Sequence, residues 1–348
     1  MATLTDRVKN HVLEAISQGK FDIGEVLPAT EEIAEKVKCS TGTVRKALTD
    51  LANEGVLKRI QRRGTVVARK PSTGHVCLIL PPEPHTNLLL HHVVHSALVN
   101  AGYEVDTVPT TMGLETVQTQ CTQLLSSGDA PDCLVVLEPS NKALYPLIED
   151  LAKRAKRRVI FQFENQKTLQ DMQLLTPDHQ KAAREVVQHL LSLGHRKIAI
   201  IAGGSPGEST WSADSAAHCR DLLEVSGAIY VPQYLFTDKH PKLIERFLKE
   251  GVTAYWAITD HEATQVVNLC YQAGLKIPQD ISIVGRHDTP WALDCHPPLT
   301  TVSLNPEGIA VAVVEALNAQ RKDPSAINKV IKVQPRLVVR ESTGPVKA

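Results

Sequence analysis

The chain has 348 residues, more than one hydrophobic core usually spans, so its length favours two domains. Hydrophobic residues make up 43% and charged residues 22%, a globular balance that excludes a disordered chain. Lys plus Arg equals Asp plus Glu at 38 each, but residues 1–70 hold 13 of the basic and 9 of the acidic residues. A basic segment on an otherwise acidic chain favours an anionic partner for that segment.

No segment predicts export or membrane insertion. Residues 1–7 lack the apolar run of a signal peptide, and no apolar stretch approaches the ~18 residues of a membrane helix. The seven cysteines are scattered without a Cys-x-x-Cys spacing, which favours free thiols over disulfides or zinc. We therefore expect a cytoplasmic protein without a metal or other cofactor.

The first seventy residues begin with three predicted helices. Residues 5–18 carry an apolar stripe at helical spacing. A second helix is expected from Thr30, a good N-cap residue that precedes two glutamates. A third is expected after a further N-cap residue, Ser40. Its apolar positions follow the i, i+3, i+4, i+7 pattern: Val44, Ala47, Leu48 and Leu51.

Two short strands are expected next, over 56–60 and 65–68, joined by a basic turn. Three helices followed by such a hairpin predict a winged helix-turn-helix. Its third helix carries small polar residues at its N-terminus and can enter the major groove of DNA. Basic side chains at the turn can reach phosphates or the minor groove. The expected DNA contacts are Ser40, Thr41, Thr43, Arg45, Lys46, Lys58, Arg62, Arg63, Gly64 and Thr65.

Residues 4–69 resemble the GntR-type DNA-binding domain. The matching positions are Gly24, Leu27, Pro28, Ile33, Ala34, Ser40, Thr43, Val44, Arg45, Ala47, Leu48, Leu51, Glu54, Gly55, Leu57, Gly64 and Thr65. The resemblance implies a bacterial transcriptional regulator that binds double-stranded operator DNA. Glu31 and Thr41 stand where the family usually has arginines that help contact DNA, which shifts the expected contacts toward Arg45 and the wing. A winged helix used for protein contacts is the alternative.

Residues 70–74 predict a short linker, so the expected domains are 1–69 and 75–348. After the linker, apolar strands alternate with helices, which indicates parallel sheets covered on both faces. The alternation restarts near residue 178 and predicts two lobes. The expected fold class is α/β, with a small winged helix-turn-helix domain followed by a two-lobed domain of parallel sheets flanked by helices.

The second domain resembles the LacI-type effector domain, which has the fold of periplasmic sugar-binding proteins. The matching motifs lie at residues 193–199, 274–285, 297–302 and 340–343. With the first domain, the resemblance spans nearly the whole chain. It implies a repressor controlled by a small sugar-like effector. Because two-fold operators are bound by two-fold proteins, we also expect a homodimer.

The effector is expected beyond the carboxyl ends of the parallel strands. Carboxylates, amides and aromatic faces at those ends suit a polyol. The strand ends, together with the position where the family usually has a sugar-contacting arginine, nominate Glu83, Asn87, Glu138, Asp178, Trp211, Ser215, Thr259, Asp260, His287 and Asp288.

Two departures from the family concern the chemistry of the effector. Ser215 replaces the usual arginine, and the usual acidic pair after the last strand is His287-Asp288, preceded by Arg286. We therefore expect a neutral monosaccharide to bind poorly. An anionic or modified sugar, with Arg286 or His287 as its partner, stays open.

Two other classes of protein compete with a DNA-binding regulator. A solute-binding protein would need only the second domain, and the basic first domain argues against it. An enzyme on a doubly wound fold would need a nucleophile–base pair or a metal set. His91 and His95 lie one helical turn apart but lack a third metal ligand. The sequence therefore predicts a transcriptional regulator and not an enzyme.

Overall fold

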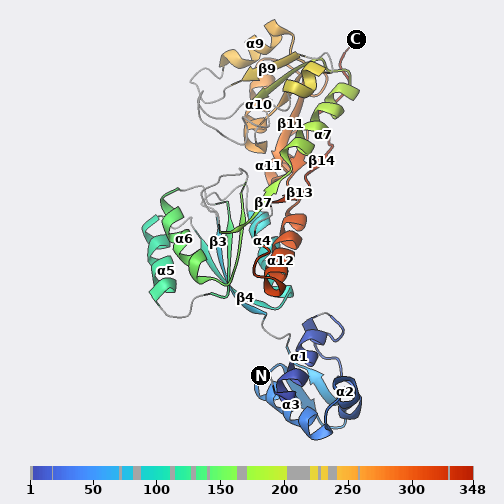
Figure 1. The fold of residues 1–348 in the computed structure, drawn as a ribbon. Helices are drawn as coiled ribbons and strands as arrows, with labels where there is room; N and C mark the ends of the chain where they lie inside the picture. Colours follow the sequence, from blue (N-terminus) through green and yellow to red (C-terminus); the bar gives the residue numbers. More distant parts are fainter. Residues whose placement is uncertain are drawn as a thin grey trace. The chain divides into compact units, whose positions relative to one another are not determined.

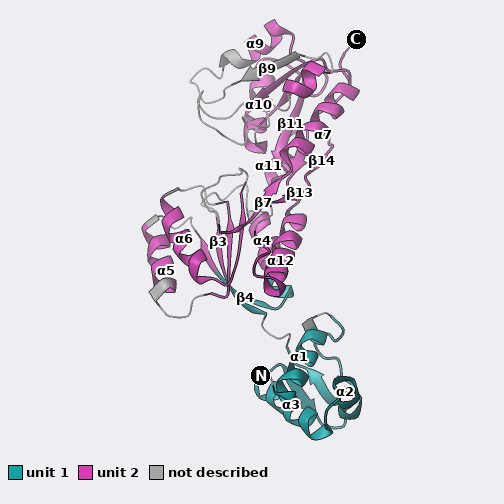
Figure 2. Cartoon of the chain, viewed as in Figure 1, with its two compact units in different colours: residues 1–76, 96–106 teal, residues 77–95, 107–348 magenta. Residues whose placement is uncertain are grey.

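A computed structural model of the chain gives the fold described below. It describes residues 3–17, 19–69, 73–80, 88–109, 114–126, 131–138, 142–162, 171–201, 220–225, 229–233, 241–257, 259–327 and 330–347. The contacts divide the chain into two compact units, residues 1–76 with 96–106 and residues 77–95 with 107–348 (Figure 2). The expected linker at residues 70–74, between domains 1–69 and 75–348, stays a prediction.

The head, residues 3–69, is three helices and a hairpin. Its elements are α1 (Leu4–Ser17), α2 (Thr30–Val37), α3 (Thr41–Asn53), β1 (Leu57–Ile60) and β2 (Gly64–Val67). The strands pair antiparallel, with Ile60 opposite Gly64. The apolar stripe of α3 is buried as predicted and packs against α1 and α2. One detail differs: the N-cap of α2 is Ala29, without a side-chain cap, and Thr30 is the first helical residue.

The first lobe is a six-stranded sheet in the order β13-β7-β6-β5-β3-β4. Its strands are β3 (Gly74–Leu80), β4 (Tyr103–Pro109), β5 (Cys133–Leu137), β6 (Arg157–Phe161), β7 (Gln173–Pro177) and β13 (Ile331–Val333). Its helices are α4 (Leu88–Asn100), α5 (Leu114–Ser126), α6 (Tyr145–Arg154) and α12 (Pro306–Lys322), with a 3-10 turn η2 (Lys142–Leu144) before α6. Figure 1 draws α5 and α6 on one side of the sheet and α12 on the other.

The second lobe has a six-stranded sheet in the order β14-β12-β11-β10-β8-β9. Its strands are β8 (Lys197–Ile201), β9 (Ile229–Gln233), β10 (Ala254–Trp256), β11 (Ser282–His287), β12 (Thr300–Ser303) and β14 (Arg336–Val338). The helices are α7 (His179–Ser192), α9 (Pro241–Glu250), α10 (Asp260–Gln272) and α11 (Pro290–Asp294). All pairs in this sheet are parallel except β12 with β14.

Residues in the second lobe alternate between the two faces of the sheet, as a period of two requires. Tyr255 packs with α9 and α10, whereas its neighbours Ala254 and Trp256 pack with α7. Two lobes of mostly parallel strands covered by helices confirm the fold class that the sequence predicted.

The chain crosses between the two sheets three times. It leaves β7 for α7, returns from β12 to α12, and crosses again from β13 to β14. The return is established by α12, which contacts β6, β7 and β13 of the first sheet. The first lobe is therefore built from two separate stretches of sequence.

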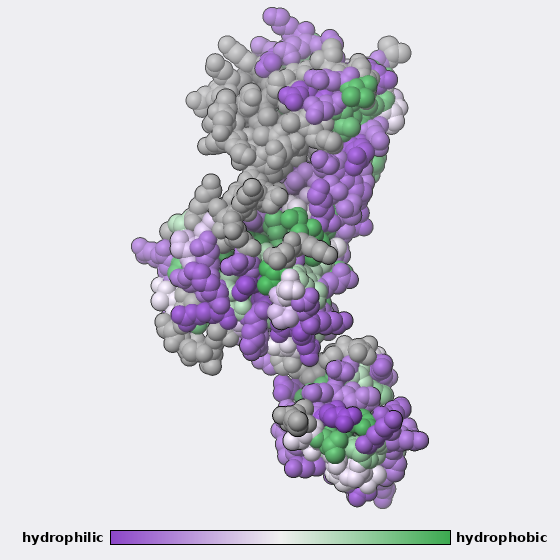
Figure 3. Space-filling model, viewed as in Figure 1, coloured by the Kyte–Doolittle hydropathy of each residue, from purple (hydrophilic) through white to green (hydrophobic). Residues whose placement is uncertain are grey.

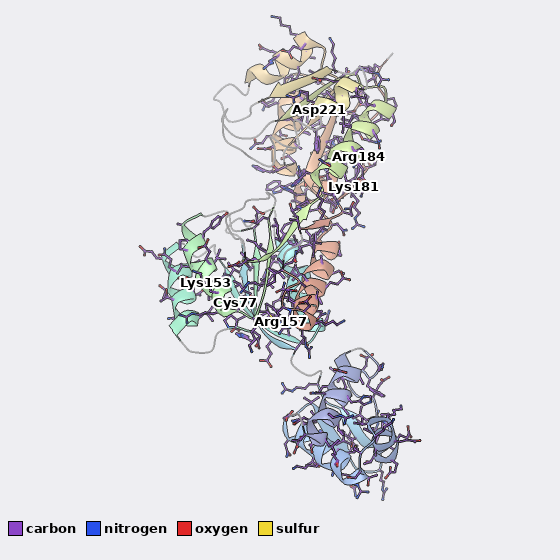
Figure 4. All side chains as sticks on the ribbon, in the orientation of Figure 1. Cys77, Lys153, Arg157, Lys181, Arg184 and Asp221 are labelled. Atoms are coloured by element: carbon purple, nitrogen blue, oxygen red, sulfur yellow. The ribbon has the colours of Figure 1, made fainter. Side chains whose placement is uncertain are left out.

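Hydrogen bonds join the three crossings to one another. Asp178, the N-cap of α7, donates its backbone N–H to the carbonyl of Val333 at 2.9 Å. Asn305, the N-cap of α12, donates Nδ2 to the carbonyl of Gln334 at 3.1 Å. Lys181 on α7, labelled in Figure 4, donates Nζ to the carbonyl of Pro335 at 2.7 Å. The caps of two helices thus also hold the third crossing.

Candidate functional site

The N-terminal end of α3 carries the polar side chains expected to contact DNA. Ser40 is the N-cap, as predicted, and its Oγ accepts the backbone N–H of Thr43 at 3.1 Å. The Ser40 and Thr43 hydroxyls lie 2.9 Å apart. Thr41 is exposed at the first helical position. The hydroxyls therefore fix the start of the helix while remaining at its surface, where they can donate to phosphate or base edges.

The head also carries four exposed cations: Arg45 and Lys46 on α3, Lys58 on β1 and Arg62 in the turn. Among the described residues, none of the four side chains has a hydrogen-bond or ion-pair partner. Their charges are therefore available to an anion. Polar side chains cover much of the head's surface in Figure 3.

Two further arginines of the hairpin are engaged inside the head. Arg59 donates to Thr49 Oγ1 at 3.1 Å and so ties β1 to α3. Arg63, an expected DNA contact, donates to the carbonyl of Gly24 at 3.3 Å. Sequence spacing could not separate these arginines from Arg62, because all of them lie on one exposed hairpin.

Gly64 and Thr65 serve the backbone of the wing. Gly64 has a φ of 104°, and a Cβ there would lie 3.3 Å from Val26 Cγ1. The carbonyl of Thr65 accepts the N–H of Leu27 at 2.9 Å, which adds the segment before α2 to the hairpin. Their contact with DNA stays a prediction.

The expected effector residues are only partly described. Glu83, Asn87, Trp211 and Ser215 lie outside the described residues. Glu138 follows β5 in the first lobe with a φ of 41° and donates its N–H to the carbonyl of Phe161 at 2.8 Å. The other described candidates belong to one edge of the second lobe or to the crossing before it. Because β10, β11 and β12 are parallel, their carboxyl ends share that edge.

Asp260 differs from the expectation in its accessibility. Its exposed fraction is 0%, and its oxygens accept three hydrogen bonds. They come from the N–H and Oγ1 of Thr289, at 2.7 and 3.0 Å, and from Oγ1 of Thr301 at 2.5 Å. Burial raises the pKa of this carboxyl to about 6. Through these bonds Asp260 connects α10 to the loop after β11 and to β12. Its contact with an effector stays a prediction.

Gly285 makes room for this carboxylate. A Cβ on Gly285 would lie 2.2 Å from Asp260 Oδ1, far inside contact distance. The two positions, 25 residues apart, are therefore coupled sterically.

Asp288 and Thr259 also have partners within the chain. Asp288 forms an ion pair with Arg340 at 2.6 Å between Oδ1 and Nη2. Arg340 also donates to the carbonyl of Leu299 at 2.9 Å. Thr259 is the N-cap of α10 and accepts the N–H of Glu262 at 3.1 Å. These contacts fix the loops at the edge.

Arg286, His179 and His287 form a basic cluster at the carboxyl end of β11, in which Arg286 and His287 are buried and His179 is half-buried. Arg286 is 2% exposed and its Nη2 lies 2.8 Å from Nδ1 of His179, the first residue of α7. His287 is buried, and burial followed by the charge of Arg286 lowers its pKa to about 3. His287 is therefore neutral at physiological pH. His179 was not among the sequence candidates, since a histidine at a helix start carries no ligand signal by itself.

Left-handed backbone marks the same loop. His287 has a φ of 96° and Asp288 one of 56°, a conformation that is uncommon for residues other than glycine. Such strain is concentrated at functional sites. This edge of the second lobe therefore combines basic side chains with a loop in an uncommon backbone conformation.

Two absences concern the described residues alone. Among them, no three His, Cys, Asp or Glu side chains are grouped so that they could hold a metal ion. No described helix is long and apolar enough to cross a membrane.

Comparison with family models matches both parts of the chain. Residues 4–67 match the bacterial regulatory proteins of the gntR family. Residues 187–343 match the periplasmic binding protein-like domain. The first match contains every expected DNA contact, and the second contains the basic cluster apart from His179.

Among curated proteins, the chain resembles the arabinose metabolism transcriptional repressor of Geobacillus stearothermophilus. The two are 26% identical over 97% of this chain and 96% of the relative. The relative is a transcription regulator rather than an enzyme, in agreement with the sequence prediction.

Solved structures share the fold. A LacI transcriptional regulator from a Rhodococcus species superimposes with a TM-score of 0.62 and 22% identity, over 78% of this chain and 99% of that one. The complex of the transcriptional regulator CelR with cellobiose superimposes with a TM-score of 0.62 and 19% identity, over 91% of this chain and 100% of the other.

Proposed function

This chain is a transcriptional regulator that joins a gntR-family DNA-binding domain to a LacI-type, periplasmic binding protein-like domain, and we propose that it acts by binding DNA under the control of a small effector. The head binds double-stranded operator DNA through the N-terminal end of α3 and the tip of the wing. The observation that carries this proposal is the set of four exposed cations in the head whose side chains have no partner among the described residues, Arg45, Lys46, Lys58 and Arg62, together with the small polar side chains at the start of α3. Cations of this kind bind phosphates, while the helix end reads bases.

A selection experiment tests DNA binding without knowledge of the operator. The full chain is incubated with a random duplex library, and enriched duplexes are measured by fluorescence anisotropy across a salt series. We expect a common sequence to be enriched and bound at least ~1,000-fold more tightly than unrelated DNA. Failure to enrich any sequence, with the chain folded, would contradict the proposal.

The two lobes bind a small polar effector, and its binding changes the affinity of the head for DNA. Support comes from the edge of the second lobe at the carboxyl ends of β10, β11 and β12. The buried guanidinium of Arg286 and the imidazoles of His179 and His287 lie there, and the backbone of the loop is left-handed. The relative named for arabinose metabolism and the neighbour bound to cellobiose favour a sugar or a sugar derivative.

Within that class, we place an anionic sugar ahead of a neutral one. Asp260 is enclosed by threonines and Asp288 is neutralised by Arg340, so the described acidic groups of the edge are already satisfied. Arg286, which is 2% exposed, supplies a positive charge at the same edge. Titration calorimetry with arabinose, cellobiose, glucuronate and glucose 6-phosphate tests this order. Tight binding of a neutral sugar alone would overturn it.

The regulator acts as a homodimer in the cytoplasm. A single winged helix reads a short half-site, and a two-fold protein matches a two-fold operator. Light scattering with DNA titration tests the stoichiometry, and a monomer that binds DNA one-to-one at micromolar concentration would contradict it.

A further inference from the structure

The turn at the tip of the wing holds an arginine where glycine would be relaxed. The N–H of Arg63 donates to the carbonyl of Ile60 at 3.1 Å, which closes a four-residue β-turn. Arg62, the third residue of that turn, has a φ of 66°, whereas Gln61 before it is not left-handed. This is the pattern of a type II turn, whose third position favours glycine because any Cβ there is strained.

Nothing inside the described chain compensates that strain. Arg62 is exposed and makes no hydrogen bond or ion pair with described residues, in contrast to Arg59 and Arg63 on the same hairpin. Asparagine and aspartate tolerate left-handed backbone by bonding locally, but an arginine has no such local compensation. A residue that is strained and without an internal partner points to a role outside the chain.

We infer that Arg62 is a phosphate-binding residue that the wing keeps at the expense of the head's own stability, while Arg59 and Arg63 position the hairpin. The inference rests on the proposed DNA-binding function and divides its basic residues into two groups. Arg62 presents a guanidinium without a hydrogen-bond partner among the described residues at the tip of the hairpin. Arg59 anchors β1 to α3 through Thr49, and Arg63 anchors the turn to the loop before α2.

Three substitutions at position 62 separate charge from strain. Arg62→Gly removes both the charge and the strain, Arg62→Ala removes only the charge, and Arg62→Lys keeps both. Each variant is made in the full chain. Duplexes enriched by the wild type, and an unrelated duplex, serve as probes in anisotropy titrations over a salt series. Hydrogen exchange of peptides from residues 4–67 reports on the stability of the head.

We expect Arg62→Gly and Arg62→Ala to bind DNA about tenfold more weakly, on enriched and unrelated duplexes alike. Each should lower the slope of log affinity against log salt by about one, as the loss of one phosphate contact requires. Arg62→Gly alone should slow exchange of the head, about three- to five-fold, because it alone relieves the backbone. Arg62→Lys should leave both readouts near the wild type.

The matched control is Arg59→Met, which should accelerate exchange and weaken binding while leaving the salt slope unchanged. Faster exchange in Arg62→Gly, or an unchanged salt slope, would overturn the inference while DNA binding by the wild type still stands. A loss confined to the enriched duplex would mean that Arg62 reads bases and would overturn the phosphate assignment. If the wild type binds no duplex, the proposed function falls together with the role of Arg62.

Discussion

The head and the carboxyl edge of the second lobe both carry dense polar side chains, but these are bonded in opposite ways. In the head, Arg45 and Lys46 extend from one helix without a partner among the described residues. At the edge, Asp260 and Asp288 are held by residues up to 52 positions away in sequence, Thr301 and Arg340 among them. A polar residue at a strand end can thus be committed to holding loops, whereas a cation on an exposed helix with no described partner is available to a ligand.

The same substitution should have opposite effects in the two regions, and this is the largest effect we expect. Gly285→Ala places a Cβ 2.2 Å from Asp260 Oδ1, whereas Gly42→Ala in α3 meets only Ser40 Oγ at 3.7 Å. Overpacking should lower the free energy of unfolding by about 3 kcal/mol for Gly285→Ala. Gly42→Ala should raise that of the head by up to ~1 kcal/mol, because alanine favours helix.

Urea unfolding followed by tryptophan fluorescence measures the first effect, since Trp256 and Trp291 both lie in the second lobe. A double mutant supplies the control. In an Asp260→Ala background the clash disappears, so Gly285→Ala should then cost less than ~1 kcal/mol. An equal cost in both backgrounds would show that the two positions are not coupled.

Lower pH should destabilise the edge through His287. Its pKa in the folded state, about 3, lies below the ~6.5 of an unfolded histidine. The unfolded state therefore binds more protons below pH 6.5, and stability falls as pH falls. Between pH 7 and 4.5 the loss from this residue should be about 2–3 kcal/mol.

The raised pKa of Asp260, about 6, acts in the opposite direction, because its folded state binds the proton more readily. The difference between wild type and His287→Asn isolates the histidine, and asparagine tolerates the left-handed backbone. The variant should lose about 2–3 kcal/mol less than the wild type over this range. Parallel pH curves for the two proteins would mean that His287 is protonated in the fold.

Arg45→Ala should weaken operator binding by about tenfold, or ~1.4 kcal/mol, with the salt slope reduced by about one. The reason is that its charge has no competing partner among the described residues. Anisotropy titrations measure it. Lys153→Ala, an exposed position of the first lobe labelled in Figure 4, should bind like the wild type. Unchanged affinity in Arg45→Ala would remove α3 as the reading helix.

The smallest effect concerns the start of α3. Ser40→Ala removes the acceptor for the N–H of Thr43 and should destabilise the head by about 1 kcal/mol. Hydrogen exchange of peptides covering α3 measures the loss. Ser40→Asp keeps an N-cap acceptor and should preserve stability, so similar losses in the two variants would contradict the capping role.

Local patterns sufficed to predict the head. Its helices and strands begin and end within one or two residues of the expected positions, and Ser40 caps α3 as expected. The strand–helix alternation likewise predicted two lobes. It did not include β7, β9 or β12. It also missed the three-residue strands β13 and β14, whose partners β7 and β12 lie far away in sequence. Segments so short carry too little periodicity to be recognised.

The effector edge was harder to predict because its side chains are defined by distant partners. Sequence placed Asp260 correctly after a strand, but not its burial among Thr289 and Thr301. Likewise, nothing near Asp288 signals its ion pair with Arg340. Arg286 was noted because it precedes His287-Asp288, the pair that differs from the family's usual acidic residues. The neighbouring His179 belongs to a helix that begins over a hundred residues earlier.

The three crossings between the sheets have a consequence for synthesis on the ribosome. The head is encoded without interruption and can fold as soon as it emerges. The first lobe has five of its strands encoded before residue 178, yet α12 and β13 are translated only after most of the second lobe. During that interval the face of β6 and β7 that α12 later covers is uncovered. A nascent chain therefore exposes apolar surface for well over a hundred residues of elongation, roughly ten seconds at bacterial rates, which is an opening for chaperones.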